Sequence, residues 1–316
     1  MPRMNPYSSL PSAGTAAVAG DRAHFLAEGP TWDAERSRLL WVDIMDGAVH
    51  TGTIGEDDTI TAAARYDFPD TAGAVAVAET GELLVAGRHR LYVRHLDGRI
   101  DAGPVLIGGE DRRFNDGKAD PRGRYLVGTK GDGDGAESLL LVENGRARVL
   151  DDDLTLSNGL AWSPDERTLY SVDTLSRRIF VREYDAATGE TGERRELIAF
   201  DGDEDSHGYP DGITIDVDDH LWVAMWGAGC VLRISPQGEI VARIDLPVPH
   251  VSCPTFAGKD LDVLVITTAT EGLSAQQLAE HPLSGRLFTA RTGHRGLPAH
   301  HWNPTRVLGN ESEAHT

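Results

Sequence analysis

A short motif recurs six times along the 316-residue chain, and its spacing limits the folds that the sequence can adopt. In most copies a polar residue opens the motif, a glycine follows, and a run suited to a β-strand comes next. The second residue of each copy is Gly29, Gly73, Gly117, Gly159, Gly212 or Cys253. The gaps between these positions are 44, 44, 42, 53 and 41 residues. A period in the range of about 20 to 50 residues predicts a repeat architecture.

Each copy is followed, after a turn, by a second apolar run. These runs cover residues 39–42, 83–86, 124–127, 168–171, 220–223 and 263–266. The fifth unit predicts four strands most clearly, over residues 212–217, 220–225, 230–234 and 240–246. Proline and glycine fall between these strands, as ladder hydrogen bonding requires. The sequence therefore predicts an all-β, six-bladed β-propeller with four-stranded antiparallel blades.

The ends of the ring are less clear from the pattern. Residues 285–291 are predicted to form a late strand of the sixth unit, and residues 276–281 a short helical or loop insertion. Either residues 24–27 or the segment beyond Pro304 closes the ring, and the sequence does not choose between them. The long gap of 53 residues is attributed to the loop at 201–209.

The propeller domain is expected over residues 21–300. Residues 1–20 are small and polar, which predicts a flexible leader, and residues 301–316 form a tail. No secretory signal core and no run of about 18 apolar residues occurs, so we expect a cytoplasmic protein that does not span a membrane. Cys230 and Cys253 are too few for a disulfide framework and are expected to be buried free thiols.

The formal net charge of −20 argues against nucleic acid or an anionic membrane as a partner, because both attract basic surfaces. A hydrophobic fraction of 40% is enough for a packed core. We expect a monomer or a weak oligomer that acts on a small molecule.

In a propeller the first strand of each blade lines the central channel, so matching positions of the six units face one another. The opening residues are Glu28, Ala72, Asp116 (preceded by Asn115), Asn158, Asp211 and Ser252. Carboxylate and amide oxygens from at least three blades therefore meet at one ring. Carboxylates that face each other in a narrow channel repel, and a divalent cation relieves this repulsion. Oxygen ligands favour a hard ion such as Ca²⁺, without separating it from Mg²⁺, Mn²⁺, Zn²⁺ or Fe²⁺.

Four motifs carry a resemblance to a known family. They are Glu28-Gly29-Pro30-Thr31-Trp32, Arg113-Phe114-Asn115-Asp116-Gly117-Lys118, Ser157-Asn158-Gly159-Leu160 and Pro210-Asp211-Gly212. In order and spacing they resemble the gluconolactonase/regucalcin (senescence marker protein) family, over about residues 26–296. The chain departs from the animal regucalcin pattern at residues 129–135, in the blade-three loop.

The resemblance implies a propeller with one catalytic divalent metal that opens sugar lactones to aldonic acids. Carried over by motif, Glu28, Asn158 and Asp211 would bind the metal, and Asp211 would also transfer a proton. Arg113 and Asn115 would bind the substrate.

Two other functions fit the same residues. One is a promiscuous phosphotriesterase-like hydrolase, which would use the same metal ligands behind a more apolar mouth. The other is a calcium-binding regulatory propeller without catalytic activity, which would bind metal tightly and turn nothing over.

Overall fold

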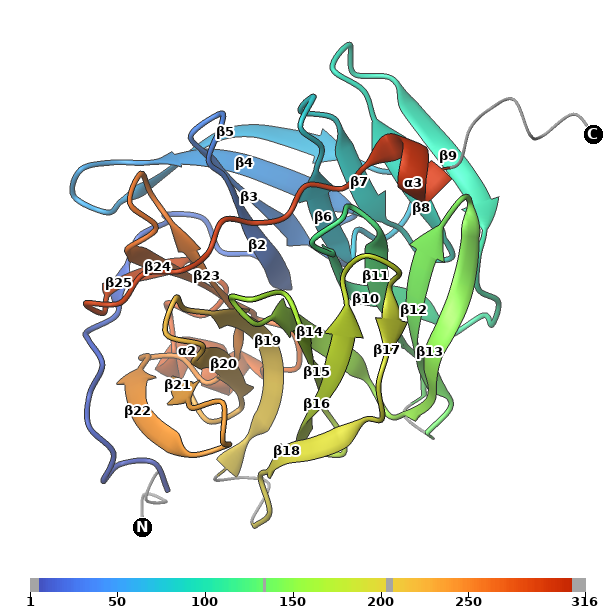
Figure 1. Cartoon of the computed structure of the whole chain (residues 1–316). Coiled ribbons are helices and arrows are strands. Elements are labelled where there is room, and N and C mark those ends of the chain that lie inside the picture. The colour runs from blue at the N-terminus through green and yellow to red at the C-terminus, as the bar shows by residue number, and fades with distance from the viewer. Residues whose placement is uncertain (1–5, 133–134, 203–206, 309–316) are drawn as a thin grey trace, which may run out of the picture.

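The computed structural model describes residues 6–132, 135–202 and 207–308. These residues form six antiparallel sheets that are arranged as blades around a central axis (Figure 1). Five of the sheets have four strands, and the sheet of blade four has a fifth, because β16 pairs with both β17 and β18. The prediction of a six-bladed β-propeller is confirmed.

The first three blades follow the chain without interruption. Blade one contains β2 (Ala27–Asp33), β3 (Arg38–Asp43), β4 (Ala48–Ile54) and β5 (Ile60–Asp67). Blade two contains β6 (Ala74–Val77), β7 (Leu83–Ala86), β8 (Arg90–Arg94) and β9 (Ile100–Val105). Blade three contains β10 (Arg113–Ala119), β11 (Tyr125–Lys130), β12 (Glu137–Glu143) and β13 (Arg146–Leu154). In each sheet the strand nearest the axis comes first.

The remaining blades include the irregular parts of the ring. Blade four contains β14 (Ser157–Trp162), β15 (Thr168–Asp173), β16 (Arg178–Asp185), β17 (Glu190–Thr191) and β18 (Arg195–Ala199). Blade five contains β19 (Tyr209–Ile215), β20 (Leu221–Trp226), β21 (Cys230–Ile234) and β22 (Ile240–Asp245). Blade six contains β23 (Val251–Ala257), β24 (Val263–Thr268), β25 (Phe288–Arg291) and β1 (Ala17–Val18). The two described helices are α2 (Ala275–Glu280) and α3 (Pro304–Leu308).

The strands predicted for blade five agree with β19–β22 to within three residues. Two of its turns contain residues in the left-handed region, Asp219 with φ 61° and Gly238 with φ 86°. Aspartate and glycine tolerate this conformation better than most residues, so the turn positions were readable from the sequence. The insertion predicted over 276–281 is α2. Part of the long gap before blade five is the β17 hairpin, and residues 203–206 of the 201–209 loop lie outside the described residues.

The ring is closed by a strand that the sequence did not indicate. Ala17 and Val18 form β1, which pairs antiparallel with β25 as the outermost strand of blade six. Residues 24–27 instead lead into blade one, and the segment beyond Pro304 forms α3 against blade three. Neither predicted closing segment is the observed one.

Both ends of the described chain contact the propeller. Tyr7 is buried and packs with the core of blades four and five, and its hydroxyl donates to the His207 carbonyl at 3.1 Å. Trp302 is also buried, and its Nε1 donates to the Glu82 carbonyl at 3.1 Å. The segment that leads to α3 crosses the face of the ring seen in Figure 1. The domain boundaries at 20/21 and 300/301 stay predictions.

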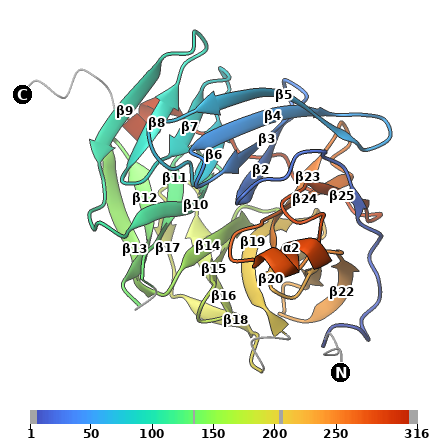
Figure 2. The ribbon, with the colours of Figure 1, turned by 180° about the vertical axis from the view of Figure 1, so that it is seen from behind.

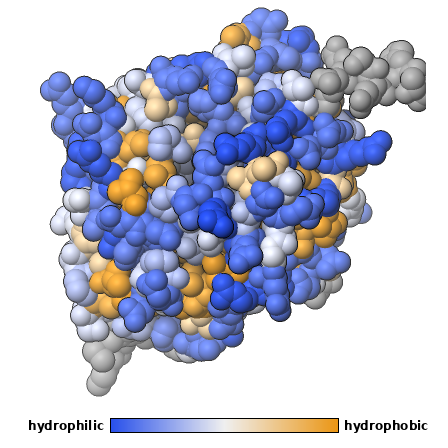
Figure 3. Space-filling view, viewed as in Figure 1, coloured by the Kyte–Doolittle hydropathy of each residue, from blue (hydrophilic) through white to orange (hydrophobic). Residues whose placement is uncertain are grey.

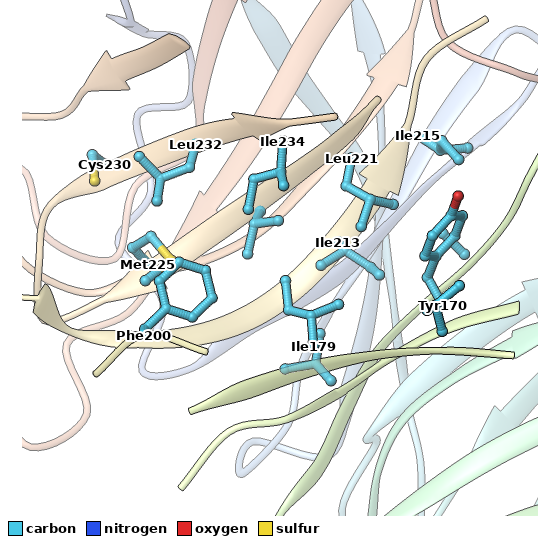
Figure 4. Packing of buried hydrophobic residues seen from close by; sticks show 14 of the residues in the cluster. Tyr170, Ile179, Phe200, Ile213, Ile215, Leu221, Met225, Cys230, Leu232 and Ile234 are labelled. Atoms are coloured by element: carbon cyan, nitrogen blue, oxygen red, sulfur yellow. The ribbon is translucent and has the colours of Figure 1, made fainter. Parts of the chain in front are cut away.

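The buried apolar residues of the described chain form six clusters, each between two neighbouring blades. Figure 4 shows one of them, in which Ile213 and Leu221 of blade five face Tyr170 and Ile179 of blade four. Burial between blades explains why the second strands are apolar on both faces. Each blade is covered on two sides, as the central strands of a packed sheet are.

The outer surface fits the acidic composition. On the face shown in Figure 3, hydrophilic side chains predominate and the hydrophobic ones lie in several separate patches. Neither described helix has the length and apolar character that crossing a bilayer requires. Cys230 and Cys253 are both buried and free, as predicted.

Candidate active site

A cavity of about 310 Å³ opens where the inner strands begin. Five side chains that the sequence singled out line it: Glu28, Arg113, Asn115, Asn158 and Asp211. Glu271 also lines the cavity and lies just before α2 in the chain. The cavity therefore lies on the side of the ring that carries α2, which faces the viewer in Figure 2.

A register shift in the inner strand accompanies almost every opening residue. These shifts lie between Glu28/Thr31, Phe114/Gly117, Asn158/Leu160, Pro210/Ile213 and Val251/Cys253. A bulge of this kind inserts an extra residue and turns the side chains beside it in a new direction. Blade two has no such shift between β6 and β7, and it is also the blade whose opening residue, Ala72, has no polar group. The bulges thus accompany the polar positions of the ring.

The glycine after the opening residue allows the inner strands to approach one another. A Cβ atom on Gly159 would lie 2.6 Å from the Asp211 carbonyl oxygen, and one on Gly212 would lie 2.3 Å from the Cys253 sulfur. Both distances are far below van der Waals contact. Close packing around the axis therefore requires glycine at Gly73, Gly117, Gly159 and Gly212, whereas Gly29 has a left-handed φ of 49° and no atom closer than 3.8 Å to such a Cβ.

Two carboxylates from different blades are buried in this cavity. Glu28 is 7% exposed and Asp211 is 5% exposed. Burial raises the pKa of Glu28 well above its usual value, and repulsion by Asp211 and Asp116 adds to the effect. Burial and repulsion by Asp116 likewise raise the pKa of Asp211. No arginine or lysine nitrogen lies within 4.0 Å of either carboxylate in the described chain, so the site fits a cation that would compensate both.

These shifts predict how the stability of the metal-free protein depends on pH. A carboxyl group whose pKa is raised by folding stabilises the folded state at low pH, and this contribution is lost as the pH rises through the folded-state pKa. In EDTA, Asp211→Asn should therefore raise the melting temperature at pH 8 and change it little below about pH 4, the usual aspartate value. Thermal unfolding between pH 4 and 8 measures this. Asp260→Asn, at an exposed position, is the control, and a lower melting temperature of Asp211→Asn at pH 8 would contradict the prediction.

Asn158 lies next to Asp211 and is oriented by three hydrogen bonds. Its Nδ2 donates to the Thr174 hydroxyl at 3.1 Å and to Asp211 Oδ1. Its Oδ1 accepts a hydrogen bond from the Gly159 N–H at 3.2 Å. The amide oxygen keeps a second lone pair, so Asn158 retains an acceptor that a hard cation can use.

Asp116 does not line the cavity, although it occupies the opening position of blade three. Its Oδ1 accepts from the Gly117 N–H at 2.8 Å, and its Oδ2 has no hydrogen-bond partner among the described residues. Burial raises its pKa. Asn115, one residue earlier, lines the cavity instead.

Lys118 closes the channel beneath the site. Its Nζ donates to the Leu160 carbonyl at 2.8 Å and to the Ile213 carbonyl at 2.7 Å, and so links blade three to blades four and five. It also lines a smaller cavity of about 90 Å³, which is covered by residues 297–300 of the C-terminal segment. The larger cavity is therefore approached from the α2 side.

Arg113 and Asn115 form one polar unit in the wall of the cavity. Arg113 Nη1 donates to the Phe114 carbonyl at 2.9 Å and to Asn115 Oδ1 at 2.8 Å. Asn115 Nδ2 donates to the Ser157 carbonyl at 3.1 Å. These bonds fix both side chains while leaving the other guanidinium nitrogens of Arg113 available for a ligand.

Arg113→Ala should act on substrate and leave metal binding intact, because a guanidinium donates hydrogen bonds and cannot bind a cation. We expect kcat/KM to fall by about 1.5–3 kcal/mol, the range for a lost charge-assisted hydrogen bond. Calorimetric Ca²⁺ titration beside lactone kinetics measures both effects. Asn115→Ala should behave in the same way if Asn115 binds substrate. A loss of Ca²⁺ affinity in Asn115→Ala would make it a metal ligand instead.

Several lining residues were not singled out from the sequence. Lys130, Thr174, Trp226 and Glu271 all line the cavity. Each lies at or just beyond the end of the second strand of its blade, beside the start of the first strand. Because the second strands were predicted from the sequence, the residues at their ends could have been predicted to line the cavity. Tyr209, the first residue of β19, lines the cavity as well.

A second acidic group lies elsewhere and has a structural explanation. Ligand atoms of Asp216, Asp218 and His294 lie within 4.8 Å of one another. Asp216 Oδ2, however, already accepts hydrogen bonds from Trp222 Nε1 at 3.0 Å and from Arg233 Nε at 2.9 Å. This carboxylate is compensated by an arginine and does not need a metal ion.

Comparison with known proteins agrees with this arrangement. Residues 26–270 match the sequence model described as SMP-30/Gluconolactonase/LRE-like region. The chain is 35% identical to 6-deoxy-6-sulfogluconolactonase of Pseudomonas putida, over 84% of this chain and 91% of the relative. It is 34% identical to regucalcin of Danio rerio, over 86% of this chain and 93% of the relative.

The fold agrees with that of a solved relative. A crystal structure of regucalcin from Agrobacterium tumefaciens, described as a calcium-binding protein, superposes with a TM-score of 0.84 at 28% identity. The superposition covers 92% of this chain and 98% of that chain. With the family motifs on one cavity and the match extending over most of its length, the chain belongs to the SMP-30/gluconolactonase/LRE-like family.

Proposed function

We propose that the protein is a divalent-metal-dependent lactonase that opens a sugar lactone to the aldonic acid. The observation that supports this most is that Glu28, Asn158 and Asp211, from three different blades, line one cavity together with Arg113 and Asn115. Relatives named 6-deoxy-6-sulfogluconolactonase and pentonolactonase support a sugar lactone as the substrate class. A cytoplasmic location and a monomeric or weakly oligomeric state are part of the proposal.

Glu28, Asn158 and Asp211 would hold the ion, and their oxygen atoms favour Ca²⁺ or another hard divalent cation. When bound, the ion would polarise the lactone carbonyl and lower the pKa of a water molecule. The two carboxylates, whose pKa values are raised in the metal-free protein, would both be ionised beside it.

Asp211 would act as the general base. Its carboxylate would accept a proton from the attacking water as the water oxygen bonds to the carbonyl carbon. When the bond between that carbon and the ring oxygen breaks, Asp211 would return the proton to the ring oxygen, which becomes a hydroxyl group. Arg113 and Asn115 would hold the lactone in position through their remaining hydrogen-bonding groups.

One observation favours the phosphotriesterase-like alternative. Apolar side chains line part of the same cavity: Leu26, Ile44, Leu156, Leu175 and Trp226. Such a wall suits a ligand with an apolar portion, and a sugar lactone uses it less fully.

A substrate panel tests the proposal directly. The protein supplied with Ca²⁺ is assayed with a pH indicator on sugar lactones, a simple alkyl lactone and a phosphotriester. We expect turnover of the sugar lactones with the highest kcat/KM. Preference for the phosphotriester would favour the alternative hydrolase, and Ca²⁺ binding without turnover of any ester would favour the regulatory protein.

A further inference from the structure

Lys130 adds a second cation to the wall that carries Arg113. Both residues line the 310 Å³ cavity. They are directly opposite partners in the ladder between β10 and β11, Arg113 at the start of one strand and Lys130 at the end of the other. Side chains of directly opposed residues project to the same face of a sheet, so the two cations share one wall.

This pair is unfavourable unless something compensates it. Like charges that lie directly opposite each other in a sheet are destabilising. Within the described chain, the ammonium group of Lys130 has no hydrogen bond and no carboxylate within 4.0 Å, and Arg113 has no carboxylate within that distance either. The neighbouring Arg112, by contrast, pairs with Glu137 at 3.2 Å. The two cations that face the cavity thus form no ion pair within the described chain, and carboxylates of the cavity attract them only from a greater distance: Glu271 and Glu28 act on Arg113, and Asp211 acts on Lys130.

The summed charge of the cavity, with the metal ion included, also indicates a missing negative charge. Its lining residues carry three negative charges, on Glu28, Asp211 and Glu271. They carry two positive charges, on Arg113 and Lys130. A divalent cation brings the cavity to one positive charge in excess, in a protein with a formal net charge of −20. A neutral lactone leaves this charge without a partner, and a lactone with an anionic group supplies one.

We propose that Arg113 and Lys130 together bind an anionic substituent of the substrate, a carboxylate or a sulfonate, in addition to the lactone ring. The inference rests on the proposed function, because the excess charge includes the metal ion. It assigns Lys130 the role of selecting an acidic sugar lactone over a neutral one.

The test uses two lactones that differ in one group. D-glucaro-1,4-lactone carries a carboxylate where D-glucono-1,4-lactone carries a hydroxymethyl group. The wild type should have the higher kcat/KM on the glucarolactone. Lys130→Met should lower that value about 10- to 100-fold, the range for a lost charge-assisted hydrogen bond, with less than about a threefold change on the gluconolactone. A gluconolactone that carries a sulfonate at C6 separates the two kinds of anion.

Two matched variants complete the design. Lys130→Arg should keep most of the preference because it keeps the charge. Lys259→Met removes a lysine from an exposed turn of blade six and should change nothing. Thermal unfolding of the Ca²⁺-loaded protein should show Lys130→Met to be at least as stable as the wild type, since the variant removes one of two like charges from a cavity that carries excess positive charge when the ion is bound.

Two results would overturn the inference. One is an equal loss of kcat/KM on both lactones in Lys130→Met, which would mean that Lys130 acts through Asp211. The other is a preference of the wild type for the neutral lactone. Failure of the proposed function gives a different pattern, with no lactone turned over. Calorimetric binding of D-glucarate to the Ca²⁺-loaded protein then decides the role of Lys130. Binding that weakens at least about tenfold in Lys130→Met supports the role, and binding that is unchanged overturns it.

Discussion

Removal of divalent metal with EDTA is expected to lower the rate of lactone hydrolysis by at least about a hundredfold, because polarisation of the carbonyl by a metal ion is worth several kcal/mol. Adding back Ca²⁺, Mg²⁺ or Mn²⁺ should each restore activity to some degree. Three oxygen-bearing side chains with room for water beside them discriminate weakly between hard ions. Initial rates on D-glucono-1,5-lactone, after metal removal is verified by elemental analysis, give the measurement.

The same samples show whether the effect is on catalysis or on folding. Glu28 and Asp211 repel each other without the ion, so metal binding should raise the melting temperature, and more at pH 8 than at pH 5. A folded, metal-free protein with full activity would remove the metal from the mechanism and leave the fold as described.

Asp211→Ala is expected to lower kcat by at least about a hundredfold, in line with the loss of a general base. Ca²⁺ affinity should fall as well, since the variant also loses one of two buried carboxylates in the cavity. Kinetics at saturating lactone, beside calorimetric Ca²⁺ titration, separate the two losses. Because Asp211 is repelled by its acidic neighbours, the variant should remain folded, which excludes unfolding as the cause of the lost activity.

Asn158→Ala is the matched comparison. It removes a neutral side chain that touches Asp211 and leaves the proposed base in place. A large excess of Ca²⁺ should therefore restore much of the activity of Asn158→Ala and none of that of Asp211→Ala. If excess metal rescued both variants equally, Asp211 would be a ligand only, and the proton acceptor would have to be another group.

The repeat period allowed much of this protein to be predicted. Copies of one motif at about 40 to 50 residues predict blades, and circular symmetry brings their opening residues together whatever their distance in sequence. This is why Glu28, Asn158 and Asp211 could be placed at one site from the sequence, although the first and the last are 183 positions apart. Proline and glycine marked most turns, because ladder hydrogen bonding keeps them out of strand interiors.

The direction of individual side chains was decided by the tertiary structure. In blade three both Asn115 and Asp116 are polar, and successive strand residues point to opposite faces. The bulge between Phe114 and Gly117 decides that Asn115 reaches the cavity and that Asp116 is buried outside it. A shift of one residue reverses that choice, and two adjacent polar residues give no sign of it; only the resemblance of the motif to that of the family singled out Asn115.

Pairing between strands that are distant in sequence decided which residue lies beside Arg113 and which segment closes the ring. Lys130 faces Arg113 only through the register of the β10–β11 ladder. The ring closes through Ala17 and Val18 because the free edge of β25 needs a partner, and a two-residue strand in a polar segment shows no period of its own. The sequence by itself determined the blades and the oxygen-bearing side chains at their centre. The tertiary structure determined which neighbours those side chains have, since backbone pairing between distant segments fixes what lies beside them.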